Sequence, residues 1–419
     1  MPPVSVLPNT IAASQPAIHR ASNGHYYSAP PDQATANKYA SLHEAIISNP
    51  AKWQSFSTGM VTTNPKLLIG DYDKSIQGLQ SVAWPEAWIA HSTQSLSSAT
   101  RIANPTFTAY YEMQSDHTTA AQTIQGITAT SWKDWIAKEH WNNLASINAQ
   151  NANAPCNLAY FDSMGQKVGG EVSWQDGHTY NQFEWYQITK TVATQAKATR
   201  PASGLWIAGN GLRGGPSYMG ASTDPANPSG NNSLLIQDLD IGLAENFVRG
   251  NFDSATAWAS DREVEQSIDM NKSGALQKKI IWNIVNLQNF TASPGHAAIS
   301  FTSTQANQWR RYTMAIYLLG NDGYSLFEFV ENTNTIKPWD ETHPWYSVVL
   351  GLPLDNRTNG AAYKNTVTGL YTRNYELGTV YLNNTTSPIT ITPGTGYTQI
   401  DGTATVSYTH LTLPTICSV

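Results

Sequence analysis

The sequence predicts an α/β fold: a (β/α)8 TIM barrel followed by a small antiparallel β domain. Apolar runs that end near a polar residue occur at 66–72, 106–111, 157–162, 204–210, 240–245, 279–286 and 324–329. Helical patterns separate most of these runs, and this alternation is typical of parallel βα units. We count six barrel strands among them and leave two unplaced, with residues 53–60 as one candidate.

The clearest helix is expected at residues 131–150. Ser131, with Asp134 three residues later, resembles a capping box. One face of this helix is expected to carry Trp132, Ile136, His140 and Leu144. Their spacing of four residues is that of an amphipathic helix packed on a core. Further helices are expected at 39–47 and 182–198.

Composition shifts divide the chain into four parts. Residues 1–35 are rich in Pro, Ser, Ala and Asn and are expected to be an extended lead-in, and residues 36–352 to form the barrel. Residues 353–405 contain short β-type runs separated by Gly378 and Pro388, a pattern that predicts antiparallel strands. Residues 406–419 resemble a translated sequencing adapter. We expect them to be an artefact outside the fold, with the true C-terminus missing, although a genuine final strand is the alternative.

The composition favours a carbohydrate as partner. Charged residues make up only 13% of the 419 residues, and aromatic residues, including 14 Trp and 20 Tyr, make up 11%. Aromatic rings stack on the apolar faces of sugars, although many large rings are simply core residues. The net charge of −6 and the lack of Lys/Arg-rich runs argue against a nucleic-acid partner. Oligomeric state is left open.

The sequence contains no signal for several other classes of protein. No apolar stretch is long enough to span a membrane. The N-terminus lacks the basic and apolar regions of a signal peptide, and secretion or association with a phage stays open. The two cysteines, Cys156 and Cys417, cannot make a disulfide framework. Without metal-ligand or phosphate-binding motifs, we expect neither a metal nor a cofactor.

Two carboxyl groups stand at the ends of predicted strands. Asp162 ends the run at 157–162, and Glu245 ends the run at 240–245. In a (β/α)8 barrel the carboxyl ends of the strands converge on the face that holds the active site. A pair of carboxyl groups is the usual equipment for cleaving a glycosidic bond. The alternative is structural: Asp162 would cap the following loop, and Glu245 would form a salt bridge.

Other polar residues near strand ends are candidates for binding a substrate. They are Asp71, Tyr72, Tyr110, Asn210 and Glu328. Asn210 is also compatible with stabilising a turn together with Gly211, and Glu328 with being an acid at the edge of the core. The loop at 213–232 is rich in Gly, Pro and Asn, and loops of this length are often functional.

Short motifs in order along the chain resemble a known group of proteins. They are Tyr160-Phe161-Asp162-Ser163, Asn210-Gly211, Ala244-Glu245-Asn246-Phe247 and the stretch at 371–383. Together, over residues 60–403, they resemble glycosyl hydrolase families with a TIM barrel that are similar to the α-galactosidase superfamily. The resemblance implies a nucleophile after strand 4 and an acid/base after strand 6. Those roles fall on Asp162 and Glu245, although the superfamily more often has Asp at the second position.

The expected function is therefore that of a glycoside hydrolase acting on an oligo- or polysaccharide by a retaining mechanism. Its two carboxyl groups need different pKa values for their two roles. A non-catalytic carbohydrate-binding barrel is the alternative from a different class, and a phage attachment protein on the same scaffold is a third. The carboxyl pair discriminates between them, because a binding module has no need of two acids at reacting distance.

Overall fold

The computed structural model describes most of the chain. The described residues are 17–23, 29–49, 52–79, 81–92, 110–150, 156–164, 172–173, 179–180, 182–201, 204–220, 233–250, 253–288, 298–332, 344–391, 398–399, 408–411 and 415–418. No helix among them is both long and apolar enough to cross a membrane.

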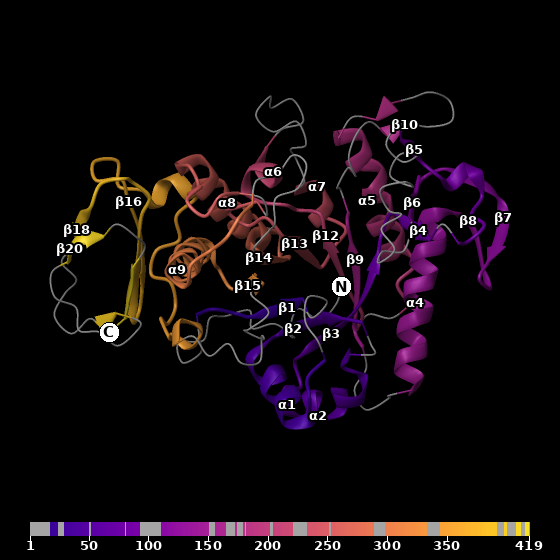
Figure 1. The fold of residues 1–419 in the computed structure, drawn as a ribbon, viewed down its shortest axis with the longest axis horizontal. Helices are drawn as coiled ribbons and strands as arrows, with labels where there is room; N and C mark the ends of the chain where they lie inside the picture. Colours follow the sequence, from indigo (N-terminus) through magenta and orange to yellow (C-terminus); the bar gives the residue numbers. More distant parts are fainter. Residues whose placement is uncertain are drawn as a thin grey trace.

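Eight parallel strands form the centre of the molecule (Figure 1). In order around the sheet they are β1 Ala21–Asn23, β2 Ala45–Ser48, β3 Leu68–Lys74, β9 Leu158–Asp162, β12 Trp206–Asn210, β13 Ile241–Ala244, β14 Ile280–Gln288 and β15 Ser325–Asn332. A parallel bridge between Arg20 and Phe327, with the Phe327 amide donating to the His19 carbonyl at 2.8 Å, joins the first strand to the last. The arrangement is consistent with the predicted TIM barrel.

The two strands that the sequence analysis left unplaced are β1 and β2. The barrel therefore begins inside the stretch 1–35 that was expected to be an extended lead-in, and the helix expected at 39–47 is split into α1 (Gln33–Leu42) and β2. The candidate strand at 53–60 is wrong, since this stretch contains the 3-10 helix η3 (Gln54–Phe56) and the start of α2 (Ser57–Thr63). Strands of three or four residues are too short for side-chain alternation to distinguish them from neighbouring turns.

Helices cover the outside of the barrel (Figure 1). They are α1, α2, α4 (Trp132–Gln150), α5 (Gln182–Ala198), the short α6 (Gly215–Met219) and α7 (Ser233–Ile236), α8 (Asp261–Gln277) and α9 (Ser303–Gly320). The helix expected at 131–150 is confirmed as α4, with the Ser131 hydroxyl accepting from the Asp134 amide at 3.3 Å. Its four predicted core residues are all buried.

Side-chain alternation divides the apolar residues into two cores. The core inside the barrel consists of Ala21, Ala45, Ile47, Leu68, Leu158, Tyr160, Trp206, Ala208, Ile241, Leu243, Ile280, Trp282, Ile284, Leu326 and Val330. The intervening strand residues, such as Ile69 and Phe161, point outward and pack with the helices. Because successive side chains of a strand point to opposite faces, this division tells which polar strand-end residues face the barrel mouth.

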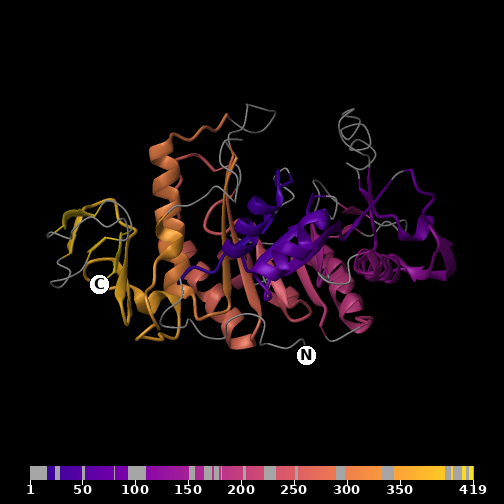
Figure 2. The same ribbon diagram turned by 90° about the horizontal axis from the view of Figure 1, so that it is seen from below.

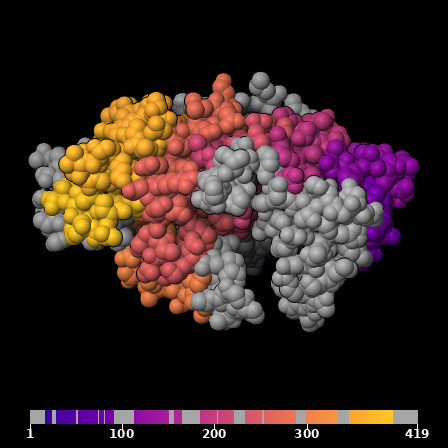
Figure 3. Space-filling view, turned by 90° about the horizontal axis from the view of Figure 1, so that it is seen from above, coloured from indigo at the N-terminus to yellow at the C-terminus, as the bar shows by residue number. Residues whose placement is uncertain are grey.

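Additional small sheets lie at the two ends of the molecule (Figures 1 and 2). One end holds the paired strands β4 (Gln77–Leu79) and β6 (Tyr110–Glu112), the hairpin β7–β8 (Thr118–Ile124 and Ile127–Ser131), and the sheet formed by β5 (His91–Ser92), β10 (Val172–Ser173) and β11 (Thr179–Tyr180). The other end holds the C-terminal strands. In the space-filling view, the purple residues of the first end and the yellow residues of the C-terminal end lie on opposite sides of the molecule (Figure 3).

The C-terminal strands are antiparallel. The predicted hairpin is present as β16 (Leu370–Tyr375) and β17 (Gly378–Asn383), followed by β18 (Ile389–Ile391) and β19 (Thr398–Gln399). The tail that we expected to lie outside the fold supplies β20 (Tyr408–Leu411) and β21 (Thr415–Ser418). β21 pairs with both β17 and β19, and β20 pairs with β18. The tail contains β-branched and aromatic residues, which favour strands that pair with the open edge of a sheet.

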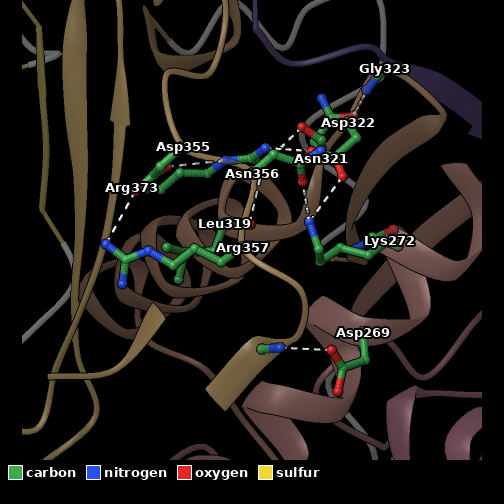
Figure 4. Close-up of polar contacts among 12 residues, drawn as sticks. Asp269, Lys272, Leu319, Asn321, Asp322, Gly323, Asp355, Asn356, Arg357 and Arg373 are labelled. Atoms are coloured by element: carbon green, nitrogen blue, oxygen red, sulfur yellow. Dashed lines mark hydrogen bonds and ion pairs between the residues drawn. The ribbon is translucent and has the colours of Figure 1, made fainter. Parts of the chain in front are cut away.

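A buried arginine ties the C-terminal sheet to the barrel helices. Arg373 of β16 is fully buried, and its guanidinium donates to the carbonyls of Leu318, Leu319 and Asn321 at the end of α9, at 3.0–3.1 Å. It also pairs with Asp322, which accepts a second hydrogen bond from Lys272 of α8 at 3.1 Å (Figure 4). The last carbonyls of a helix have no partner within the helix, so the arginine satisfies them and offsets their negative partial charge.

Candidate active site

Asp162 is held firmly at the end of the fourth barrel strand. Its main-chain carbonyl accepts from the amide and hydroxyl of Ser75, at 3.0 and 2.6 Å. Its carboxylate accepts from the Tyr72 hydroxyl at 2.5 Å through Oδ2, and from the Asn210 amide at 2.9 Å through Oδ1. Both carboxylate oxygens are therefore oriented by donors from neighbouring strands.

Glu245 directly follows the sixth barrel strand and lies close to Asp162. Its Oε2 accepts from Asn210 Nδ2 at 2.7 Å, and the same nitrogen donates to Asp162 Oδ1. Because both oxygens lie within hydrogen-bond distance of one nitrogen, their separation cannot exceed the two bond lengths combined. This limit applies to the two nearest oxygens, and it favours the carboxyl separation of about 5–5.5 Å in retaining glycosidases over the about 6.5–9.5 Å of inverting ones.

Tyr72 acts as a hydrogen-bond donor in this cluster. Burial, the charge of Asp162 and the hydrogen bond to Asp162 all raise the pKa of the Tyr72 hydroxyl, and the charge of Glu245 raises it further. A phenol with a raised pKa keeps its proton and continues to donate to the carboxylate. Its ring lies 5.4 Å from that of Tyr160, which belongs to the core inside the barrel.

The loops that follow the strands carry unusual backbone geometry. Three non-glycine residues with positive φ come just after barrel strands: Ser163 (61°), Arg213 (62°) and Val248 (68°). The value for Val248 is unexpected because β-branched residues rarely adopt this region. Gly211 is required for a different reason, since a Cβ at this position would overlap the Met164 carbonyl. Backbone strain of this kind tends to gather at functional sites.

Glu328 lies inside the barrel, as its position in β15 requires. It is only 5% exposed. Its Oε1 accepts from the Asn23 amide at 2.7 Å, and its Oε2 accepts from the Trp282 indole at 3.1 Å. These partners belong to β1 and β14. Glu328 therefore faces the same interior as the carboxyl pair, but its hydrogen-bond donors come from strands that carry neither Asp162 nor Glu245.

Two of the predicted binding residues lie elsewhere. Asp71 is adjacent to Tyr72 in β3 and therefore points to the opposite, outer face of the sheet, where it pairs in register with Ala159 of the outer core. Tyr110 belongs to β6, which pairs with β4 outside the barrel. An apolar run alone does not tell which sheet a strand joins, and two adjacent residues cannot both face one side of a strand.

Asp71 is part of a buried group of carboxyls with Asp73 and Glu139 of α4. Burial and the charge of Asp73 raise the pKa of Asp71 to about 7. Burial, the charge of Asp73 and a hydrogen bond with Asp73 raise the pKa of Glu139. Since no three side chains of His, Cys, Asp or Glu in the described part of the chain are placed to hold a metal ion, we treat this group as a structural cluster.

Because the pKa values of Asp71 and Glu139 are raised, we expect the free energy of unfolding to fall as pH rises. A carboxyl whose folded pKa lies above its unfolded value, about 3.9 for Asp, keeps a proton that the unfolded chain has lost. The free energy of unfolding should therefore fall from about pH 4 to about pH 7 because of Asp71, and further because of Glu139. The variant Glu139→Gln should be more stable than the parent at pH 8 by about 1–3 kcal/mol, with a smaller difference at pH 5.

Urea unfolding at pH 5 and pH 8 measures this difference. The exposed Glu86 offers a matched control, since Glu86→Gln should leave the pH dependence unchanged. Identical pH slopes for Glu139→Gln and the parent would show that these carboxyls titrate normally.

The structure also brings forward polar residues that the sequence analysis did not single out. Asn286 of β14 has the same strand parity as Trp282 and Ile284, so its side chain faces the barrel interior. It is 1% exposed, and neither polar atom of its amide has a hydrogen-bond partner among the described residues. Arg249 and Asn246, which follow Glu245 in the chain, likewise carry buried polar atoms without partners. Their position just beyond a strand end was the available signal.

Comparisons with known proteins show similarity in fold alone. No family model and no curated protein matches the chain. Among solved structures, a GH36 α-galactosidase from Geobacillus stearothermophilus in complex with 1-deoxygalactonojirimycin is similar over 97% of this chain and 56% of its own, with 9% identity and a TM-score of 0.41. An isomaltulose synthase from Klebsiella sp. LX3 is similar over 97% of this chain and 98% of its own, with 10% identity and a TM-score of 0.45.

A second GH36 α-galactosidase from Geobacillus stearothermophilus gives a similar result, with 10% identity, 97% and 55% coverage and a TM-score of 0.42. The chain thus spans about half the length of these α-galactosidases. At these identities and scores the likenesses carry no information about chemistry, which must come from the side chains of the site.

Proposed function

We propose that this protein is a retaining glycoside hydrolase in which Asp162 is the nucleophile and Glu245 the acid/base. The observation that carries the proposal is the single amide nitrogen of Asn210, which donates to both carboxylates. It brings one oxygen of each acid within hydrogen-bond distance of the same nitrogen, which supports a separation like that of retaining glycosidases.

The roles follow from the partners of each acid. A nucleophile must present one oxygen to the anomeric carbon in a fixed direction, and Asp162 is oriented by Tyr72 and Asn210. Glu245 would protonate the leaving oxygen and then take a proton from the attacking water. Asn210 holds the two groups in register and would give way to substrate as the sugar enters between them.

The experiment that tests this proposal uses a panel of 4-nitrophenyl α- and β-glycosides together with common oligosaccharides. Proton NMR of the first product formed would show the configuration at the anomeric carbon, and we expect it to be retained. Inversion would contradict the assignment of Asp162 as nucleophile. Binding of sugars without hydrolysis of any member of the panel would favour the carbohydrate-binding barrel.

Asn286 should contribute to substrate binding at a cost in stability. Its buried amide, which is without partners in the described residues, is suited to sugar hydroxyls, and leaving such groups unpaired costs about 1–3 kcal/mol. The variant Asn286→Leu should therefore unfold at higher urea concentration while its KM for a hydrolysed glycoside rises roughly tenfold or more.

The matched control for this variant is Asn283 on the outer face of the same strand. Its amide donates to Asn271 at 2.8 Å and to the Leu326 carbonyl at 3.1 Å, so Asn283→Leu should destabilise the protein. If both variants lose stability, the buried amide of Asn286 is satisfied in solution and the reasoning fails.

A further inference from the structure

A cavity opens between the loops that follow β12 and β13, which begin after Asn210 and Ala244. Its volume is about 290 Å³, near the lower end of the range of ligand sites, and it has room for a single sugar unit. The lining residues are Arg213, Gly214, Pro216, Ser217, Asn246, Val248, Arg249, Gly250, Asp253 and Glu263. Asn246 directly follows Glu245, and its amide donates to the Arg213 carbonyl at 3.2 Å, so the cavity is continuous with the backbone that positions the acid.

Arg249 brings a buried positive charge to this cavity, where the charge of Asp253 acts on it without satisfying its Nε. Its side chain is 3% exposed, and its two terminal nitrogens donate to the main-chain carbonyls of Asn286 and Asp253, at 2.7 and 2.5 Å. Its Nε has no acceptor among the described residues. Buried charges are normally paired and hydrogen-bonded, so a buried guanidinium with an unsatisfied Nε requires an explanation.

The acids that line the cavity accept hydrogen bonds from groups other than Arg249. Asp253 accepts from the Gly250 amide at 2.6 Å, and Glu263 accepts from the amide and hydroxyl of Ser260 in the capping box of α8. The guanidinium of Arg249 instead lies over the rings of Phe301 and Trp309. Burial lowers the pKa of Arg249 to about 10 and also lowers that of Arg213. Both cations are thus partly stripped of water, as expected of a site that receives an anion.

The other unpartnered atom is an acceptor. Asn246 Oδ1 is buried at the cavity and has no hydrogen-bond donor among the described residues. The ligand that completes this set must therefore offer both a negative group for Arg249 and a hydroxyl for Asn246. The positive φ of Arg213 and Val248 indicates that the two loops are held in this shape against local preference.

We propose that this cavity binds a sugar unit that carries an anionic substituent, a carboxylate or a sulfate, and that the substrate is an acidic glycan. The proposal rests on the function proposed above, because it assigns a substrate class to the proposed hydrolase. Arginine is suited to both anions, since its planar fork matches their oxygens and it remains charged when buried.

Isothermal titration calorimetry on the full chain tests the proposal without requiring turnover. The probes are glucuronate, galacturonate and glucose 6-sulfate, with glucose and galactose as neutral references. We expect at least one acidic sugar to bind tenfold or more tightly than its neutral reference, and the difference between the uronates and the sulfate identifies the anion. Equal affinities for acidic and neutral sugars would overturn the proposal.

Two variants test whether the acidic sugar binds in this cavity. Arg249→Met should remove the preference for acidic sugars, but it also removes two hydrogen bonds to main-chain carbonyls. Asn246→Asp is nearly isosteric and adds a negative charge at the cavity, so it should weaken binding of the acidic sugar tenfold or more and leave the neutral sugar unaffected. Asn374→Asp, on the exposed surface of β16, makes the same charge change as a control. Equal effects of Asn246→Asp on both kinds of sugar would contradict a charge-reading site.

The outcomes separate this inference from the hydrolase proposal. A protein that prefers acidic sugars but cleaves no glycoside keeps the cavity assignment and loses the reaction. A protein that cleaves neutral glycosides without preference for an acidic unit keeps the reaction and loses the cavity assignment.

Discussion

Asp162→Asn should abolish glycoside hydrolysis, with a fall in kcat on the order of 10⁴-fold or more, as expected when a nucleophile is lost. The amide cannot form the covalent intermediate, while the shape of the side chain is kept and its one oxygen still accepts from either Tyr72 or Asn210. Initial rates on whichever glycosides of the panel the parent hydrolyses give the measurement. The variant should unfold at nearly the same urea concentration as the parent.

A rescue experiment distinguishes loss of a nucleophile from loss of positioning. Asp162→Gly leaves space at the anomeric carbon, and added azide should restore turnover of an activated aryl glycoside and yield a glycosyl azide. Glu245→Gln provides the matched comparison, because an acid/base variant should lose most activity on poor leaving groups and less on activated ones. Full activity in Asp162→Asn would refute the assignment of the carboxyl pair.

Arg373→Met should be the most destabilising single change in the C-terminal sheet, with a loss of about 3–5 kcal/mol. The substitution leaves three main-chain carbonyls at the end of α9 without their buried donor, and it leaves Asp322 with Lys272 alone of its two cations. Urea denaturation followed by tryptophan fluorescence measures the loss. The kcat of the remaining folded protein should be unchanged, because Arg373 contacts none of the four clustered site residues.

Arg357 provides the surface comparison for this prediction. Its side chain is 35% exposed and pairs with Asp355 at 3.2 Å, so Arg357→Met should cost no more than about 1 kcal/mol. If the two variants lose the same stability, the interface between β16 and α9 does not depend on the buried arginine.

Much of the barrel could be predicted because its signals are local. Apolar runs of five or more residues between helical patterns mark β3, β9, β12, β13, β14 and β15. The strands β1 and β2 escaped notice because three or four residues carry too little alternation. The tail at 408–418 was set aside because of its resemblance to adapter sequence, yet it pairs with β17 and β18.

The candidate site was predicted in part for a similar reason. A residue at the end of a long strand has a defined place in a barrel, so Asp162, Asn210 and Glu245 could be named from the chain, and Tyr72 faces the same interior. Asp71 could have been excluded, because side-chain alternation allows only one of two neighbours to face inward. Tyr110 could not, since pairing of its strand with β4 depends on contacts outside the run itself.

The sequence by itself determined the order of six of the eight barrel strands and the placing of an acid at the end of two of them. These features depend on residues close together in the chain, where periodicity and strand polarity are sufficient. Only the tertiary structure decided that one amide bridges the two acids, that Asn286 is buried without partners among the described residues, and that the buried Arg249 lines a cavity with its Nε unsatisfied by the described residues. Each of these features joins segments that are far apart in the sequence. Closure of the whole barrel brings these segments together.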